Sequence, residues 1–235
     1  MKYAEWMRLA ATERERTLAL VESLDEVDWK KPTDCPAWDV RELVAHLVGI
    51  AEMQASQREM RRQLKLGKKV ARGRPAIDGA TEVQVRERAD ATPAQLVAHL
   101  HDATARGLRA RGRVPAPVRI LPIPFGPPLG VRPMGYLIGC IFTRDAWMHR
   151  VDLCRATGVE LELTPDHDGA VIADVVAEWS RTHGRPYELD LTGPAGGTFS
   201  SGAGGEAHRL DAVDFARVLS GRGAGSGLLA TQIPF

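Results

Sequence analysis

Residues 33–47 read TDCPAWDVRELVAHL, and residues 144–152 read RDAWMHRVD. Each segment is typical of a helix and carries a histidine, His46 in the first and His149 in the second. Asp145 precedes His149 by four residues, so the two side chains project from the same face of one helix. We therefore expect Asp145 and His149 to converge on one metal ion, with His46 approaching from a neighbouring helix.

These three ligands leave the fourth position of a tetrahedral metal ion open. Structural zinc sites usually have four protein ligands, whereas catalytic sites keep one position for water or substrate. Cysteine competes poorly for the ligand role, because Cys35, Cys140 and Cys154 are far apart and form no CxxC pair. The pattern predicts a catalytic divalent metal. Zinc is the first choice, although nitrogen and carboxylate ligands also accept nickel, iron or manganese.

Composition limits the classes of function. The chain has 235 residues, 44% of them hydrophobic, and a formal net charge of +1, so no overall field attracts nucleic acid or anionic lipid. No apolar run approaches the roughly 20 residues that span a bilayer, and the amino terminus is charged too early for a signal peptide. We expect a cytoplasmic protein with reduced cysteines, a small-molecule substrate, and neither a nucleic-acid nor a membrane partner.

The first part of the chain has the pattern of a helical bundle. Apolar spacing and capping residues predict helices over residues 3–24, 40–66, 92–111 and 134–157, and Gly158 is expected to end the last one. Residues 67–75 read as a loop. Between residues 112 and 133 we expect a long extended connection, because it contains Pro115, Pro117, Pro122, Pro124, Pro127 and Pro128. Four helices with two long connections indicate a four-helix bundle.

The pattern of predicted elements changes after Gly158. We expect a helix over residues 166–182, a strand over 187–192, glycine-rich turns around Phe199, a helix over 211–219 and an edge strand within 227–235. The fold class is therefore α+β. The predicted domains are a metal-binding helical bundle over residues 1–158 and a small α+β domain over residues 159–235.

Several motifs resemble the mycothiol-dependent maleylpyruvate isomerase family. They are TDCPAWDVRELVAHLVG and FTRDAWMHRVDLCRATG, followed by EWSRTHG, LTGPAGG, LSGRG and the terminal IPF. The resemblance implies a DinB-like four-helix bundle that carries a divalent metal, with His46, Asp145 and His149 on the three ligand positions. The family pattern has glutamate where this chain has Asp145, whose side chain is one methylene shorter.

The resemblance also implies a thiol cofactor, mycothiol. Zinc deprotonates a coordinated thiol, and the thiolate would add to a conjugated cis double bond, which rotates before elimination returns the trans product. A related transferase would stop after addition or displacement, and both outcomes fit these residues. The resemblance further assigns Arg222 of LSGRG to the site, where its guanidinium would clamp a substrate carboxylate. Without the resemblance to this family, Arg222 would be interpreted as a solvated surface arginine.

Other residues of the second motif allow further interpretations. Asp152 lies three residues after His149 and can orient it through its other ring nitrogen, or else cap or pair locally. Arg144 and Arg150 are expected as surface or interdomain charges. One rival function is a non-catalytic small-ligand-binding protein with a vestigial metal site. Another is a hydrolase that uses a zinc-bound water, with Asp152 as its general base.

Overall fold

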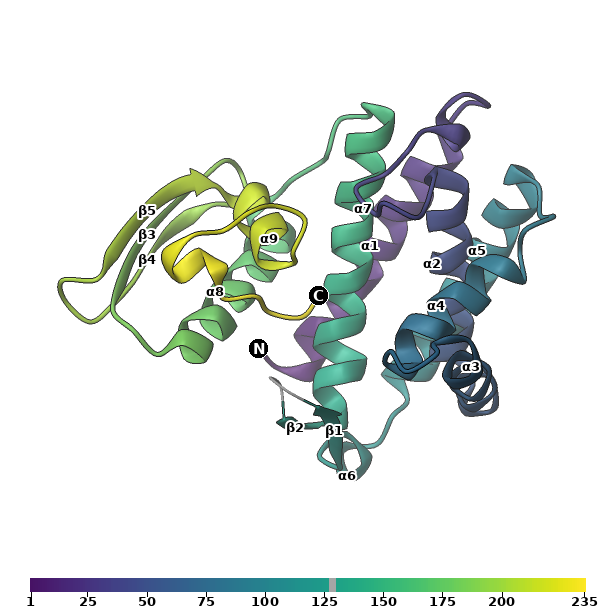
Figure 1. Ribbon diagram of the computed structural model, residues 1–235, viewed down its shortest axis with the longest axis horizontal. Coiled ribbons are helices and arrows are strands. Elements are labelled where there is room, and N and C mark those ends of the chain that lie inside the picture. The colour runs from purple at the N-terminus through teal and green to yellow at the C-terminus, as the bar shows by residue number, and fades with distance from the viewer. Residues whose placement is uncertain (127–129) are drawn as a thin grey trace. The chain divides into compact units, whose positions relative to one another are not determined.

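The computed structural model describes residues 1–126 and 130–235 (Figure 1). It divides into two compact units, one over Lys2–Val159 and one over Glu160–Phe235 together with Met1. The first unit is built almost entirely of helices, and the second combines helices with a three-stranded sheet. The α+β fold class is therefore confirmed. Among the described residues, no helix has the length and apolar character needed to cross a membrane.

Four long helices form the bundle of the first unit. They are α1 (Tyr3–Glu22), α2 (Val40–Ala55), α5 (Pro93–Gly112) and α7 (Phe142–Thr157). Contacts join α2 to α5, α1 to both α5 and α7, and α2 to α7. Their facing sides carry fully buried apolar residues such as Leu9, Leu43, Leu96, Trp147 and Val151. Burial of this apolar stripe on each helix stabilises the bundle and fixes the faces of α2 and α7 that meet.

The second predicted helix is two helices. The chain leaves α2 at Ser56, whose backbone is extended with φ −147° and ψ 121°, and continues as α3 (Gln57–Val70). The hydroxyl of Ser56 accepts a hydrogen bond from the backbone N–H of Glu59 at 3.3 Å, so Ser56 is the N-cap of α3. Apolar spacing does not reveal the break, because helical patterns continue on both sides of it.

A further helix, α4 (Ala76–Arg86), was not predicted and packs against α3 and α2 (Figure 1). Gly67 was read as the start of a loop, but it lies within α3, where it lets the two helices approach closely. A Cβ at Gly67 would lie 2.4 Å from the carbonyl oxygen of Ala76, and one at Gly79 would lie 2.1 Å from that of Gly67. These glycines therefore serve helix packing and not chain reversal.

The other predicted bundle elements agree with the structure at most of their ends. Thr92 caps α5 with a capping box to Gln95, and Gly158 ends α7 with φ +80°.

The proline-rich connection contains a short helix, α6 (Ala116–Arg119), and an antiparallel hairpin of β1 (Pro122–Gly126) and β2 (Gly130–Pro133). Pro127 and Pro128 lie outside the described residues. A π-helical turn over Tyr136–Ile141 leads into α7, where one continuous α-helix was expected.

The second unit contains a sheet of order β4-β3-β5, in which β3 pairs antiparallel with β4 and parallel with β5. Its elements are α8 (Ala170–His183), β3 (Tyr187–Thr192), β4 (Gly197–Ser201), β5 (Glu206–Asp211) and α9 (Ala212–Leu219). The predicted edge strand within residues 227–235 is wrong. That segment forms a 3-10 turn over Gly227–Ala230, and its backbone bonds to other elements, with the carbonyl of Leu228 accepting from Trp179 Nε1 at 3.0 Å.

Candidate metal centre

The structure brings His46, Asp145 and His149 together between α2 and α7. One ligand atom from each residue lies within 4.8 Å of the other two. Nε2 of His149 is 3.5 Å from Oδ1 of Asp145. A tetrahedral zinc ion bound at ordinary distances separates a nitrogen and an oxygen ligand by about 3.4 Å, so this pair already has the required spacing. The donor set of two imidazoles and one carboxylate therefore fits a divalent ion of this class.

Local sequence explains how His46 reaches this position. Asp39 begins α2 as a capping box with Glu42, accepting from the backbone N–H of Glu42 at 2.8 Å. His46 follows two turns later on the buried face of the helix and is 3% exposed. The indole of Trp38 stacks on its ring, with centroids 5.0 Å apart and planes at 27°. Trp38 thus covers one face of the imidazole, whereas the partly exposed Asp145 side chain leaves the site accessible.

A relay of two amides fixes the orientation of His46. Gln84 Oε1 lies 2.7 Å from His46 Nδ1, while Gln84 Nε2 donates to Gln63 Oε1 at 2.7 Å. Gln63 Nε2 in turn donates to the backbone carbonyl of Gly49 and to Glu59, each at 3.0 Å. Because a carbonyl only accepts, each amide in this relay must present its oxygen toward His46. Nδ1 of His46 therefore carries the proton, and Nε2 keeps its lone pair for a metal ion.

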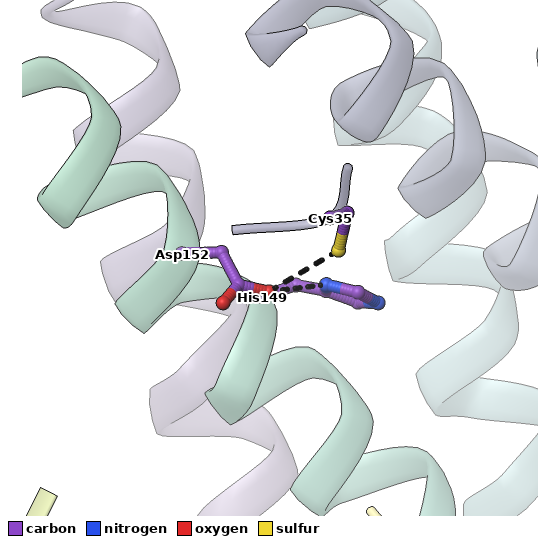
Figure 2. A group of neighbouring side chains, drawn as sticks. All are labelled: Cys35, His149 and Asp152. Carbon is purple, nitrogen blue, oxygen red and sulfur yellow. Dashed lines mark hydrogen bonds and ion pairs between the residues drawn. The ribbon is translucent and has the colours of Figure 1, made fainter. Parts of the chain in front are cut away.

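Asp152 orients the second histidine in the same way. Its Oδ2 accepts from Nδ1 of His149 at 2.9 Å, and the Sγ of Cys35 donates to the same oxygen at 3.7 Å (Figure 2). The expected contact between Asp152 and the second ring nitrogen of His149 is confirmed. This contact lies on the Nδ1 side of the ring, whereas Asp145 lies on the Nε2 side. Asp152 is therefore badly placed to act as a general base on a metal-bound water, which argues against the hydrolase.

The two histidines differ in charge when no metal is bound. Burial is the main cause that lowers the pKa of His46 from 6.5 to about 4, and the nearby His149 lowers it further. Burial also disfavours a charged His149, but Asp145 and Asp152 outweigh it and raise its pKa well above 6.5. At neutral pH, His46 is thus ready to coordinate a cation, whereas His149 must first release a proton.

Three residues of this site were not recognised in the sequence. Gln84 and Gln63 lie on α4 and α3, and α4 itself was missed, although Pro75 followed by apolar residues at 77, 80 and 83 is a usable helix signal. Cys35 was expected only as a reduced cysteine, but it is partly exposed and contacts Asp152. Its position in the same TDCPAW segment that precedes His46 is the only sequence hint of this contact.

The two arginines of the second motif are not surface charges. Arg144 is fully buried and Arg150 is 2% exposed. Nε of Arg150 donates to Oε1 of Glu13 on α1 at 2.7 Å, so this ion pair joins two helices of the bundle. The surface interpretation was wrong because α7 has neighbours on more than the ligand-bearing side, and a charged residue facing one of them needs a buried partner.

Arg222 belongs to the other compact unit. It lies in the turn after α9, where it is partly exposed and its backbone N–H donates to the carbonyl of Arg217 at 2.9 Å. Gly221 precedes it with φ +83°, a conformation that favours glycine.

Comparison with known proteins gives two kinds of match. Residues 10–154 match the family described as the mycothiol maleylpyruvate isomerase N-terminal domain. The fold resembles the crystal structure of the mycothiol-dependent maleylpyruvate isomerase, with TM-score 0.63 and 16% identity over 96% of this chain and 92% of that one. A histidine-to-alanine mutant of that isomerase gives TM-score 0.63 and 15% identity, covering 95% of this chain and 91% of that one. No curated protein matches the chain in sequence.

Proposed function

The chain belongs to the family of the mycothiol maleylpyruvate isomerase N-terminal domain, and we propose from this premise that it is a metal- and thiol-dependent isomerase. The observation that carries the proposal is the convergence of His46, Asp145 and His149, with Nδ1 of each imidazole hydrogen-bonded to a fixed partner so that Nε2 is the atom left for the ion. Fixed tautomers and three ligands with room for a fourth are what a catalytic metal site requires.

The residues of the site divide into those that would hold the ion and those that orient its ligands. His46, Asp145 and His149 would hold the ion, for which we propose zinc, and a bound zinc ion makes a coordinated thiol a thiolate near neutral pH. Gln84 and Asp152 hold the imidazoles in place, which reduces the rearrangement that binding requires. Both histidines are buried, so water has little access to their rings.

The co-substrate that we propose is mycothiol, because the similar crystal structures are those of a mycothiol-dependent isomerase. The electrophile is a small unsaturated carboxylate. The thiolate sulfur adds to one carbon of its conjugated cis double bond, and the π electron pair moves onto the conjugated carbonyl as an enolate. The bond, now single, rotates. Return of the electron pair expels the thiolate and restores the double bond in the trans form. The thiol is regenerated, so the net reaction is isomerisation. An S-transferase would use the same addition or displacement and omit the final elimination.

We propose Arg222 as the clamp for a carboxylate of this substrate. The support is its place in LSGRG, the planar fork of its guanidinium, which matches a carboxylate with two hydrogen bonds, and its partial exposure. We also propose that the protein acts in the cytoplasm, because its three cysteines form no disulfide in the part of the chain that the structure describes.

The test combines metal analysis with an assay. Elemental analysis of the purified protein should give about one divalent metal per chain, and His46→Ala and His149→Ala should each remove it. The metal-loaded protein should isomerise maleylpyruvate when mycothiol is present and not when it is omitted, and Arg222→Met should weaken this activity while leaving the metal bound. Metal content unchanged in both histidine variants would reject the site. A metal-free protein that retains an apolar ligand through purification would favour the small-ligand-binding alternative.

A further inference from the structure

Arg111, near the end of α5, is a buried cation with neutral partners. It is 6% exposed. Its Nε donates to the carbonyl of Ile138 at 2.6 Å, and its Nη2 donates to Thr143 Oγ1 at 2.8 Å and to the carbonyl of Gly139 at 3.4 Å. Its Nη1 is 3.4 Å from Gln54 Oε1, a long contact. Over the described residues, no carboxylate forms an ion pair with Arg111.

The charge of Arg111 persists despite this burial. Burial lowers the pKa of Arg111 to about 10, which still leaves the guanidinium protonated at neutral pH. The partners at Ile138 and Gly139 belong to the π-helical turn before α7, and they explain why hydrogen-bond donors are needed there. They do not explain a full positive charge, because neutral donors would satisfy the same carbonyls at a lower desolvation cost.

A cavity of about 60 Å³ adjoins this guanidinium. By this measure one water needs about 10–15 Å³, so the space holds roughly four waters or a few heavy atoms of a ligand. Apolar side chains supply most of its wall, among them Leu47, Ile50, Ala51, Leu100 and Phe142. Arg14 also lines it, and its guanidinium likewise bonds to neutral acceptors, Thr104 Oγ1 and the carbonyl of His101, each at 3.1 Å.

The same cavity reaches the metal centre. Asp145 is the one carboxylate among the described residues that line it. Phe142, Asp145 and His149 recur at helical spacing, so they share one face of α7. The Arg111 guanidinium carbon lies 5.8 Å from the centre of the Phe142 ring, and Asp145 follows about 4.5 Å further along the helix axis. The cavity thus connects a buried cation with a proposed metal ligand.

We propose that this cavity is the carboxylate-binding subsite of the substrate. Arg111 holds the carboxylate of a short, otherwise apolar acid, with Gln54 as a second contact, and the far end of that acid faces the ion held by Asp145. The inference rests on the proposed function and deepens it. It defines the substrate as a short-chain acid and places one carboxylate contact inside the helical bundle, separate from the contact proposed for Arg222.

The test uses butyrate as a probe and butyramide as its neutral analogue. The unfolding midpoint is followed as sodium butyrate replaces sodium chloride at constant ionic strength, for the metal-loaded and the metal-free protein. Butyrate should raise the midpoint in a saturable way, and butyramide should not. Arg111→Met should weaken butyrate binding about 10- to 100-fold, the loss expected for a charge-assisted hydrogen bond. Arg113→Met, at an exposed arginine two residues further on, is the matched control and should bind like the wild type.

A second variant keeps the test decisive if Arg111→Met does not fold. Ala51→Val fills part of the cavity and leaves the guanidinium intact, so it should also abolish the butyrate effect. Equal binding of butyrate and butyramide, or wild-type binding by either cavity variant, overturns the proposal. Arg111-dependent binding in a protein that fails the isomerase assay supports the subsite and rejects the proposed reaction, so the two failures can be told apart.

Discussion

The side-chain oxygen of Gln84 lies 2.7 Å from Nδ1 of His46, so a residue outside the proposed ligand set determines which nitrogen of His46 is available to a metal ion. Both partners are buried, and Gln84 is itself held by Gln63. Two helices that carry no proposed ligand, α3 and α4, therefore contribute to the candidate metal centre. They fix its geometry before any ion arrives, which reduces the reorganisation that binding requires.

Removing this hydrogen bond should weaken metal binding without removing a ligand. Gln84→Met keeps the size of the side chain but leaves Nδ1 of His46 without its acceptor. We expect metal affinity to fall about 10- to 100-fold, as is typical for loss of a partner of a metal-bound histidine. Competition with a chromophoric chelator measures the change. Gln57→Met, at an exposed position on α3, is the control. A folded Gln84→Met protein with wild-type affinity would contradict the role assigned to the relay.

Gly49 should be equally sensitive, for a steric reason. A Cβ at this position would lie 2.4 Å from Cγ and 2.5 Å from Cβ of Gln84, so α2 and α4 must separate or Gln84 must move. We expect Gly49→Ala to cost about 1–3 kcal/mol of unfolding free energy and also to weaken metal binding, because the displaced amide no longer reaches His46. Denaturant unfolding and chelator competition measure the two effects.

Gly112→Ala is the matched control for this substitution. Gly112 is the last residue of α5, and a Cβ there would meet nothing within 4 Å. Alanine has the higher helix propensity, so the control should be neutral or up to about 1 kcal/mol more stable than the wild type. Wild-type stability and metal affinity in Gly49→Ala would show that the two helices can separate at no cost, which would refute the argument.

The helices that bear the proposed ligands could be located from sequence because they follow local rules. The N-cap of α5, the glycine after α7 and the DxxxH spacing all depend on residues within a few positions of one another. The convergence of Asp145 and His149 follows from helix geometry alone. The approach of His46 to them required only that α2 and α7 be neighbours in a bundle.

The residues that orient the proposed ligands do so through contacts between segments that are distant in the sequence. A local sequence pattern does not predict such contacts. Gln84 is 38 positions from His46, and its role requires the close crossing of α2 and α4 that Gly49 permits. Glu13 and Arg150 are 137 positions apart. A charged residue in a helical sequence is normally assigned to the solvent side. The sequence shows that burying the charge would cost free energy, but it does not show the distant partner of opposite charge that offsets this cost.

Breaking the Glu13–Arg150 pair should therefore be costly. Both side chains are buried, at 1% and 2% exposure. Either Glu13→Gln or Arg150→Met removes a buried ionic partner of the remaining charge, and we expect a loss of about 3–5 kcal/mol in unfolding free energy. The exposed pair Arg106–Asp102 on α5 is the control, and Arg106→Met should cost less than about 1 kcal/mol. Losses of similar size in both pairs would mean that burial does not set the energy of the first.

Metal binding should release a proton, and the source of that proton is His149. In the metal-free protein its pKa is raised well above 6.5, so it is protonated at neutral pH, whereas His46, with a pKa of about 4, is not. Coordination requires the Nε2 lone pair of His149. Affinity should therefore rise with pH by about one decade per unit until the raised pKa is passed, and level off above it. Calorimetry at pH 7 in buffers of different ionisation enthalpy should find about one proton released per ion.

The Asp152→Asn variant separates this proton from one lost by a metal-bound water. Asp152 is one of the two carboxylates that hold the proton on His149, and Cys35 shares its Oδ2 (Figure 2). With asparagine in its place, the pKa of the free imidazole should fall, so fewer protons should be released at pH 7 and the rise of affinity should end at lower pH. A proton from a metal-bound water would appear in equal number in both proteins. Equal proton release in wild type and Asp152→Asn, or no release at all, would refute the charge state assigned to His149. It would also refute the inference that the two carboxylates beside His149 prepare the site to bind a cation.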